Sequence, residues 1–200
     1  MRKLTAVLAG SVLAFSVAGA ANAAFPVYPT PGTENPVTYS FSAAVGGDIV
    51  AYFAGQDAGD TEDLGLLIDG VDTGIYGLSN HSTAVGTALN FGHVDAGQSL
   101  TFFIRDGGNK WYSDKSLNSD GFNHIWITPY AGGDAGVPAG IFAAFEDLPH
   151  GGDKDYNDET FVFANIARGG VPEPATWSLM ILGIGTAGAM LRQARKLAIA

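Results

Sequence analysis

The sequence predicts an all-β domain of the β-sandwich or jelly-roll type, flanked by an N-terminal signal-peptide helix and a C-terminal transmembrane helix. Nine short runs rich in Val, Ile, Phe and Thr lie between residues 37 and 166, and turns rich in Gly, Asp and Asn separate them. Between the two ends, from residue 24 to residue 174, no helical period is longer than two turns. Two uncharged apolar runs lie outside this region, one near each end of the 200-residue chain.

The β domain is expected to cover residues 37–168, and its strands can be assigned in chain order. Asp69-Gly70 lies between two apolar runs, which is a hairpin signal. Residues 24–36 contain four prolines and are expected to form an extended lead-in. The nine expected strands span 37–41, 49–53, 64–68, 71–76, 89–94, 100–105, 124–128, 141–145 and 160–166.

Residues 1–23 have the three-part layout of a secretory signal peptide. A basic start, Met1-Arg2-Lys3, is followed by 14 uncharged, mostly apolar residues and then by small residues that end in Ala21-Asn22-Ala23. Small residues at Ala21 and Ala23 predict cleavage before Ala24. The mature protein is therefore expected to begin at Ala24 and to be exported.

Residues 175–191 are the second uncharged run, 17 residues long. As a helix this run would be about 26 Å long, against about 30 Å for the hydrocarbon core of a bilayer. Basic residues follow it at Arg192, Arg195 and Lys196. By the positive-inside rule, these residues leave the tail in the cytoplasm and the domain outside.

The residues around this run resemble the PEP-CTERM sorting signal of exopolysaccharide-producing Gram-negative bacteria. Residues 171–196 contain Pro-Glu-Pro, a tryptophan, a Gly-rich apolar run and a basic cluster, and Gln193 and Ala194 dilute that cluster. The resemblance implies that an exosortase, a membrane transpeptidase or protease, processes the chain near Pro-Glu-Pro. The protein would then be anchored in the inner membrane only transiently, before it reaches the cell surface or the medium. The residues that match the signal are Pro172, Glu173, Pro174, Trp177, Arg192, Arg195 and Lys196.

Composition excludes several functional classes. The chain has no cysteine, which removes disulfides, thiolate metal sites and a Cys nucleophile. Its formal net charge is −10, and residues 24–171 hold 19 acidic but only 5 basic residues. Nucleic acid is therefore not an expected partner, because phosphate binding needs a basic face.

The most specific internal segment is 145–159, which contains six carboxylates, one asparagine and one lysine. Carboxylates crowded into one loop repel each other unless a cation or backbone donors compensate. The alternate spacing of Asp153, Asp155 and Asn157 resembles the start of an EF-hand loop, but Asp158 and Ala164 stand where the EF-hand needs Gly and Glu. The segment therefore predicts either a calcium site or an Asp/Asn-rich turn that caps backbone N–H groups. The expected calcium ligands are Glu146, Asp147, Asp153, Asp155, Asn157 and Asp158.

A second acidic stretch precedes the strand at 64–68. It comprises Asp57, Asp60, Glu62 and Asp63 and lacks alternate spacing. We expect it to form a solvated loop.

Two short motifs, Phe145-Glu146-Asp147-Leu148 and Asp155-Tyr156-Asn157-Asp158, resemble a bacterial extracellular domain family known only as a domain of unknown function. The resemblance extends over roughly residues 45–166. It implies a β-sandwich module on an exported protein and brings no activity with it.

No catalytic constellation is evident. The four histidines lack zinc spacing, Gly-x-Ser-x-Gly is absent, and His124, which is close to Trp126 in the sequence, is expected to be a strand residue packed near an aromatic residue. The sequence therefore predicts a non-enzymatic structural or binding protein of the cell surface or exopolysaccharide matrix, with calcium as its stabilising ion. The alternative is a secreted hydrolase of surface polysaccharide. A cleft lined by carboxylates and aromatics such as Trp111, Tyr112 and Trp126 would favour the hydrolase, whereas acidic residues confined to the end loops of a closed sandwich would favour the binding module.

Overall fold

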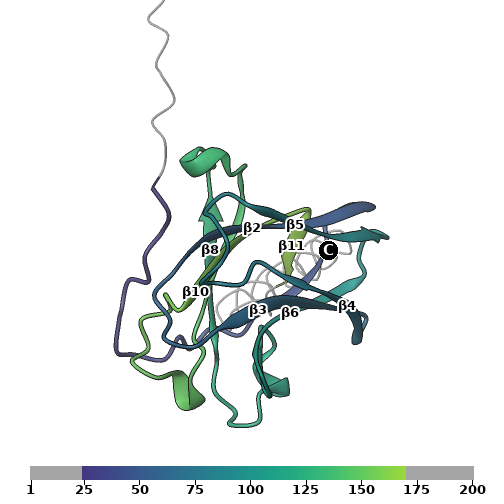
Figure 1. Ribbon diagram of the computed structural model, residues 1–200. Helices are drawn as coiled ribbons and strands as arrows, with labels where there is room; N and C mark the ends of the chain where they lie inside the picture. The colour runs from purple at the N-terminus through teal and green to yellow at the C-terminus, as the bar shows by residue number, and fades with distance from the viewer. Residues whose placement is uncertain (1–23, 170–200) are drawn as a thin grey trace, which may run out of the picture.

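The computed structural model describes residues 24–169. In this part of the chain, 11 strands form two antiparallel sheets that pack face to face (Figure 1). Three short 3-10 helices lie in the connections between strands. The all-β prediction is confirmed. None of the helices in this range is long and apolar enough to cross a membrane. The predicted signal peptide and the predicted span 175–191 lie outside the described residues.

The two sheets use the strands in a non-sequential order. The first sheet runs β11-β1-β6-β3-β4, with β7 paired to β6, and the second runs β5-β2-β10-β9-β8. The first sheet contains β1 (Ser40–Ala43), β3 (Glu62–Ile68), β4 (Val71–Gly77), β6 (Ser99–Asp106), β7 (Asn109–Tyr112) and β11 (Ile166–Gly169). The second contains β2 (Gly47–Gln56), β5 (Ala88–Val94), β8 (Ile125–Tyr130), β9 (Gly140–Phe145) and β10 (Glu159–Ala164). The 3-10 helices are η1 (Lys115–Leu117), η2 (Asp134–Gly136) and η3 (Pro149–Gly151).

Alternating apolar residues from both sheets form the main core. Side chains at every second position point to the same face of a strand, so each strand contributes one row to the space between the sheets. Phe102 of β6 and Phe163 of β10 stack across this space with ring centroids 3.8 Å apart. Both are fully buried, as are Leu64 and Leu66 of β3.

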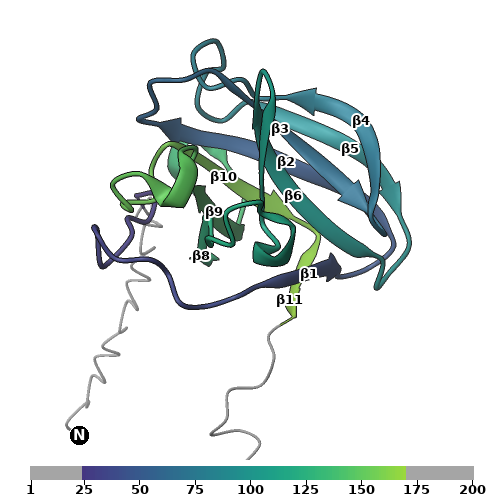
Figure 2. The ribbon, with the colours of Figure 1, turned by 90° about the horizontal axis from the view of Figure 1, so that it is seen from below.

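A second apolar cluster lies on the outer face of the second sheet. The predicted lead-in contains no strand, but its aromatic residues cover this face. Phe25 lies 5.2 Å from Tyr130, and Tyr28 lies 4.6 Å from Tyr156, measured between ring centroids. Figure 2 shows the segment running along one side of the molecule into β1. Residues 24–36 are therefore part of the packed domain.

Three features of the strand prediction are wrong. The expected strand 37–41 begins only at Ser40 and continues to Ala43 as β1, and Val37 O accepts from the Asn123 side chain instead of from a neighbouring strand. The expected strand 160–166 is split, because Asn165 has φ 61° and turns the chain from β10 in one sheet to β11 in the other. β7 was not expected, since its four residues include a lysine and an asparagine and carry no apolar alternation. The hairpin prediction is confirmed, because Asp69 and Gly70 have φ of 50° and 80° between paired β3 and β4.

Candidate cation site

Three carboxylates continue inward-facing rows of core residues at one end of the sandwich. Glu62 begins β3, Asp106 ends β6, and Glu159 begins β10. Each stands two residues from an apolar residue of the main core, at Leu64, Ile104 and Phe161 respectively. The exposed fraction is 1% for Glu62 and 0% for Glu159. The strand periodicity therefore places acidic side chains where the core would otherwise continue.

The expectation of a solvated loop is wrong for Glu62. β3 already begins at this residue, and its alternation directs the side chain into the interior. Asp57 and Asp60 are exposed, as expected. Asp63 points to the opposite face from Glu62 and forms an ion pair with Arg105 at 3.4 Å. Extending the Leu66-Leu64 alternation backwards by one step would have identified Glu62 from the sequence.

The loop between β9 and β10 covers the same end of the sandwich. It turns tightly, because Gly151, Gly152, Lys154 and Tyr156 all have positive φ. A Cβ at position 151 would overlap the ring of Phe122, so only glycine allows this approach. The turn brings carboxylate oxygens of Glu146, Asp153 and Asp155 within 4.8 Å of one another.

Hydrogen bonds account for part of this acidic loop. Tyr156 N donates to Glu146 Oε1 at 2.5 Å, and Asp147 N donates to Asp158 Oδ2 at 2.9 Å. The amide nitrogen of Asn157 donates to Asp155 Oδ2 at 2.6 Å. These are contacts of a capped turn. They leave Glu146 Oε2 and Asp155 Oδ1 buried without a hydrogen-bond partner among residues 24–169.

A pocket of about 350 Å³ opens at this end of the molecule. Four of the six expected ligands line it, and Asp155 adjoins it through the oxygen cluster with Glu146 and Asp153. Asn157 does not line the pocket. The side chains and backbone around the pocket come from Asp57, Gly59, Asp60, Glu146, Asp147, Leu148, Gly152, Asp153 and Asp158.

Burial and mutual repulsion raise the pKa of these carboxyl groups. Burial is the main cause for Glu146, whose pKa rises to about 8; the hydrogen bond from Tyr156 N opposes the rise, and Asp158, Asp153 and Asp155 add to it. Burial, and then the charges of Asp147, Asp60 and Asp106, raise the pKa of Glu62 to about 8. Burial likewise raises the pKa of Asp158 to about 7 and that of Glu159 to about 9.

Basic side chains do not offset this charge. Within the described range, no lysine, arginine or histidine forms an ion pair with Glu62, Glu146, Asp147, Asp158 or Glu159. Lys154, the lysine of the loop itself, lies with Nζ 5.9 Å from the ring centroid of Phe122. Within residues 24–169, ionisation of these carboxyl groups is therefore not offset by a basic side chain, which is consistent with their raised pKa values.

A polar network fixes the backbone of Glu146 to the segment that precedes β8. Glu146 N donates to His124 O at 3.0 Å, and His124 Nδ1 lies 2.8 Å from Glu146 O. His124 Nε2 lies 3.0 Å from Asp120 Oδ2, which also accepts from His150 N at 2.7 Å. The start of the acidic loop is thereby held to the segment that precedes β8.

His124 packs against an aromatic residue, as expected, but it is not a strand residue. β8 begins at Ile125, so His124 lies before the strand. Its ring stacks on Trp111 with centroids 4.1 Å apart. Trp126 contacts Tyr28 of the lead-in on the outer face of the second sheet.

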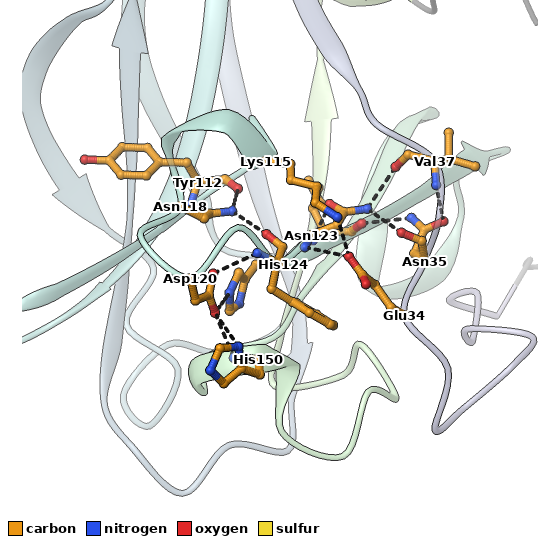
Figure 3. Close-up of polar contacts among 12 residues, drawn as sticks. Glu34, Asn35, Val37, Tyr112, Lys115, Asn118, Asp120, Asn123, His124 and His150 are labelled. Atoms are coloured by element: carbon orange, nitrogen blue, oxygen red, sulfur yellow. Dashed lines mark hydrogen bonds and ion pairs between the residues drawn. The ribbon is translucent and has the colours of Figure 1, made fainter.

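Buried amides join the lead-in to the same segment. Asn123 Nδ2 donates to Asn35 O at 2.9 Å and to Val37 O at 2.8 Å, and Lys115 pairs with Glu34 at 2.6 Å (Figure 3). These contacts could not be predicted from the sequence, because asparagines in loops carry no signal that separates buried from exposed ones.

Comparison with known proteins gives two family matches. Residues 78–165 match a domain of unknown function (DUF4114), and residues 170–196 match the PEP-CTERM protein-sorting motif. No curated protein and no solved structure matches the chain. The first match includes the whole acidic loop but not Glu62, and the second includes every residue predicted for sorting. A PEP-CTERM motif implies an exported protein that is anchored transiently in the membrane and processed by an exosortase. Residues 78–165 are thus similar to DUF4114, and the PEP-CTERM protein-sorting motif follows them at residues 170–196.

Proposed function

We propose that this protein is an exported, non-catalytic structural or binding module of the cell surface or exopolysaccharide matrix, and that bound Ca²⁺ stabilises it. The ion lies between Glu146, Asp153 and Asp155, with Asp147 and Asp158 as further oxygen donors. The export part of the proposal is supported by the sorting motif.

The calcium proposal rests mainly on the unpaired carboxylate oxygen of Glu146. The Glu146 side chain is completely buried, yet its Oε2 has no hydrogen-bond partner within residues 24–169. An unpaired buried carboxylate costs at least about 1–3 kcal/mol, so it is retained only where something compensates. Carboxylate oxygens of Glu146, Asp153 and Asp155 lie within 4.8 Å of one another. Three acceptors at this distance suit a shared cation.

The donor set favours Ca²⁺ among the biological cations. Ca²⁺ takes six to eight oxygen ligands in flexible geometry, whereas transition metals prefer nitrogen or sulfur. The cluster offers carboxylates only, and the chain has no cysteine. Asp147 and Asp158 line the adjoining pocket and could complete the shell together with water.

The surroundings of the cluster support a binding module over a polysaccharide hydrolase. Trp111 is 4% exposed and stacks on His124, and Trp126 packs against Tyr28, so neither lines the acidic pocket. Tyr112 is likewise absent from the pocket lining found among the described residues. The carboxyl groups of Glu159 and Glu62, whose pKa values are raised to about 9 and about 8, are buried and do not line the pocket, so a sugar chain in the pocket would not contact them.

The test is thermal melting of the full-length protein, purified in detergent, first with chelator and then with Ca²⁺ up to several millimolar. Extracellular calcium modules bind at around 10⁻⁴ to 10⁻³ M, so lower concentrations would not suffice. Binding at a hundredfold excess over Kd adds about 2.7 kcal/mol, which should raise the Tm by several degrees. The double variant Asp153→Asn/Asp155→Asn should lose this response, whereas Asp95→Asn in the exposed β5–β6 turn should keep it. If the wild-type Tm changes neither with chelator nor with calcium, the loop is only a capped turn.

A further inference from the structure

A second group of carboxylates lies on the β3 side of the acidic end, outside the loop 146–158. Oxygens of Asp60, Glu62 and Asp106 lie within 4.8 Å of one another. Glu62 and Asp106 are direct cross-strand partners in the antiparallel pairing of β3 with β6. Like charges directly opposite each other destabilise a sheet, so this pair needs compensation.

Protein groups supply only part of that compensation. Asn80 Nδ2 donates to Glu62 Oε2 at 2.7 Å. The Glu62 side chain is 1% exposed, and no N–H or O–H group in the described part of the chain donates to its Oε1. The Asp147 carboxyl group lies within hydrogen-bond reach of the Glu62 carboxyl group, but it is itself an acid and adds no positive charge. Among residues 24–169, the Asp106 carboxylate accepts hydrogen bonds from Asn109 only, at Oδ1 from the backbone N at 3.1 Å and from Nδ2 at 3.2 Å, and at Oδ2 from Nδ2 at 3.4 Å, whereas a carboxylate can accept several more.

The basic residues beside this group are turned away from it. Arg105 precedes Asp106, so its side chain lies on the opposite face of β6. There it pairs with Asp63 at 3.4 Å and lies over the ring of Tyr76, with Cζ 3.5 Å from the centroid. Lys110 pairs with Asp72 at 2.9 Å. The alternation that brings Glu62 and Asp106 inward thus takes the local cations outward.

We propose that Asp60, Glu62 and Asp106 bind a second Ca²⁺, in addition to the ion proposed at Glu146, Asp153 and Asp155. The inference rests on the proposed function and deepens it, because it gives the same end of the sandwich two ions. Asp60 and Asp147 both line the acidic pocket, so the two sites share one opening to solvent. Glu159 is buried near Glu62, and burial, followed by the charges of Glu62, Asp63 and Asp147, raises its pKa to about 9, which the backbone N–H of Asn80 only partly opposes.

The second ion would join parts of the fold that the first one does not touch. Asp60 lies in the β2–β3 connection, and Glu62 and Asp106 belong to the first sheet. The ion at Glu146 lies within the β9–β10 connection of the second sheet. Two ions would therefore stabilise the acidic end of the sandwich by binding residues from both sheets.

The test is the number of Ca²⁺ ions bound per chain, measured by equilibrium dialysis with radioactive calcium on the full-length protein in detergent. Wild type should bind two ions. Glu62→Gln, which keeps an oxygen for Asn80, should bind one, and Glu146→Gln should also bind one. Asp63→Asn is the matched control, since it removes a carboxylate from the other face of β3, and it should bind two. Circular dichroism checks that each variant is folded.

The outcomes separate this inference from the proposed function. One ion in wild type and in Glu62→Gln, with none in Glu146→Gln, would overturn the second site and leave the first. No ion in wild type would overturn both. Two ions in Glu62→Gln would overturn the assignment to Glu62. If Glu62→Gln does not fold, Asp106→Asn replaces it: one bound ion supports the second site, and two contradict it.

Discussion

At the residue scale, the properties of Glu146 determine how the calcium-free protein should respond to loss of one charge. Its carboxylate is buried, and the pKa is raised to about 8, chiefly by burial. Glu146→Gln keeps an oxygen for the hydrogen bond from Tyr156 N but removes the charge. Measured at pH 8 in chelator, the variant should therefore melt several degrees above wild type, since a buried unpaired charge costs at least about 1–3 kcal/mol. A lower Tm that still rises with calcium would contradict this explanation.

Asp120 has the opposite character. Burial raises its pKa, but hydrogen bonds from His150 N, Phe122 N and the His124 ring outweigh this and lower the pKa to about 2. A depressed pKa stabilises the fold above the unfolded value near 3.8, and this stabilisation is lost as pH falls toward 2. Asp120→Asn should lower the unfolding free energy at pH 7 by about 1–3 kcal/mol, because charge-assisted hydrogen bonds are lost.

Chemical denaturation at pH 7 and pH 3 measures this effect. The difference between Asp120→Asn and wild type should be large at pH 7 and smaller at pH 3. Asp114→Asn, whose carboxylate caps η1 at an exposed position, is a control for removal of a local turn acceptor. An equal loss at both pH values would show that the Asp120 charge does not contribute.

At the scale of the element, the β9–β10 loop depends on glycine at one close contact. Gly151 has φ 71°, and an added Cβ would overlap the Phe122 ring. Gly97, in the β5–β6 turn, has φ 84° with open space around it. Gly97→Ala should therefore cost only the backbone term of about 1–2 kcal/mol. Gly151→Ala should cost more and should weaken calcium binding as well, measured by melting and by calcium titration. If the two variants lower the Tm equally, the close contact between position 151 and Phe122 does not contribute to stability.

Periodicity in the sequence predicts which face a side chain occupies but not which strand lies opposite. The hairpin at Asp69-Gly70 could be predicted, because its geometry is local. The acidic loop 146–158 could also be predicted, since its charges are contiguous. The meeting of Glu62 with Asp106 and Glu159 could not, because it depends on the non-local order of β3, β6 and β10. The break at Asn165, where the chain passes from one sheet to the other, could not be predicted for the same reason.

At the scale of the whole molecule, the raised pKa values predict an unusual pH dependence for the calcium-free protein. Between about pH 5 and pH 8, the folded state binds more protons than the unfolded state, because the pKa values of Glu62, Glu146, Asp158 and Glu159 are raised to between about 7 and about 9. Its stability should therefore fall as pH rises, by up to about 1.4 kcal/mol per pH unit for each extra proton.

Calcium should remove this dependence. A bound cation keeps the carboxylates ionised, so the calcium-loaded protein should have a nearly constant Tm over the same range. Thermal melting at pH 5, 6, 7 and 8, with and without calcium, measures both curves. A calcium-free Tm that rises from pH 5 to pH 8 would contradict the assignment of raised pKa values to the cluster.

Anomalous diffraction from crystals grown in millimolar calcium would test most directly whether the acidic end of the sandwich binds cations. We expect an anomalous peak about 2.3–2.6 Å from Glu146 Oε2, the usual distance for a calcium–oxygen ligand. A second peak at the same distance from Glu62 Oε1 would correspond to the second ion. A map without a peak at Glu146, in which a protein group or an ordered water hydrogen-bonds to Oε2, would show that the acidic end does not bind calcium there.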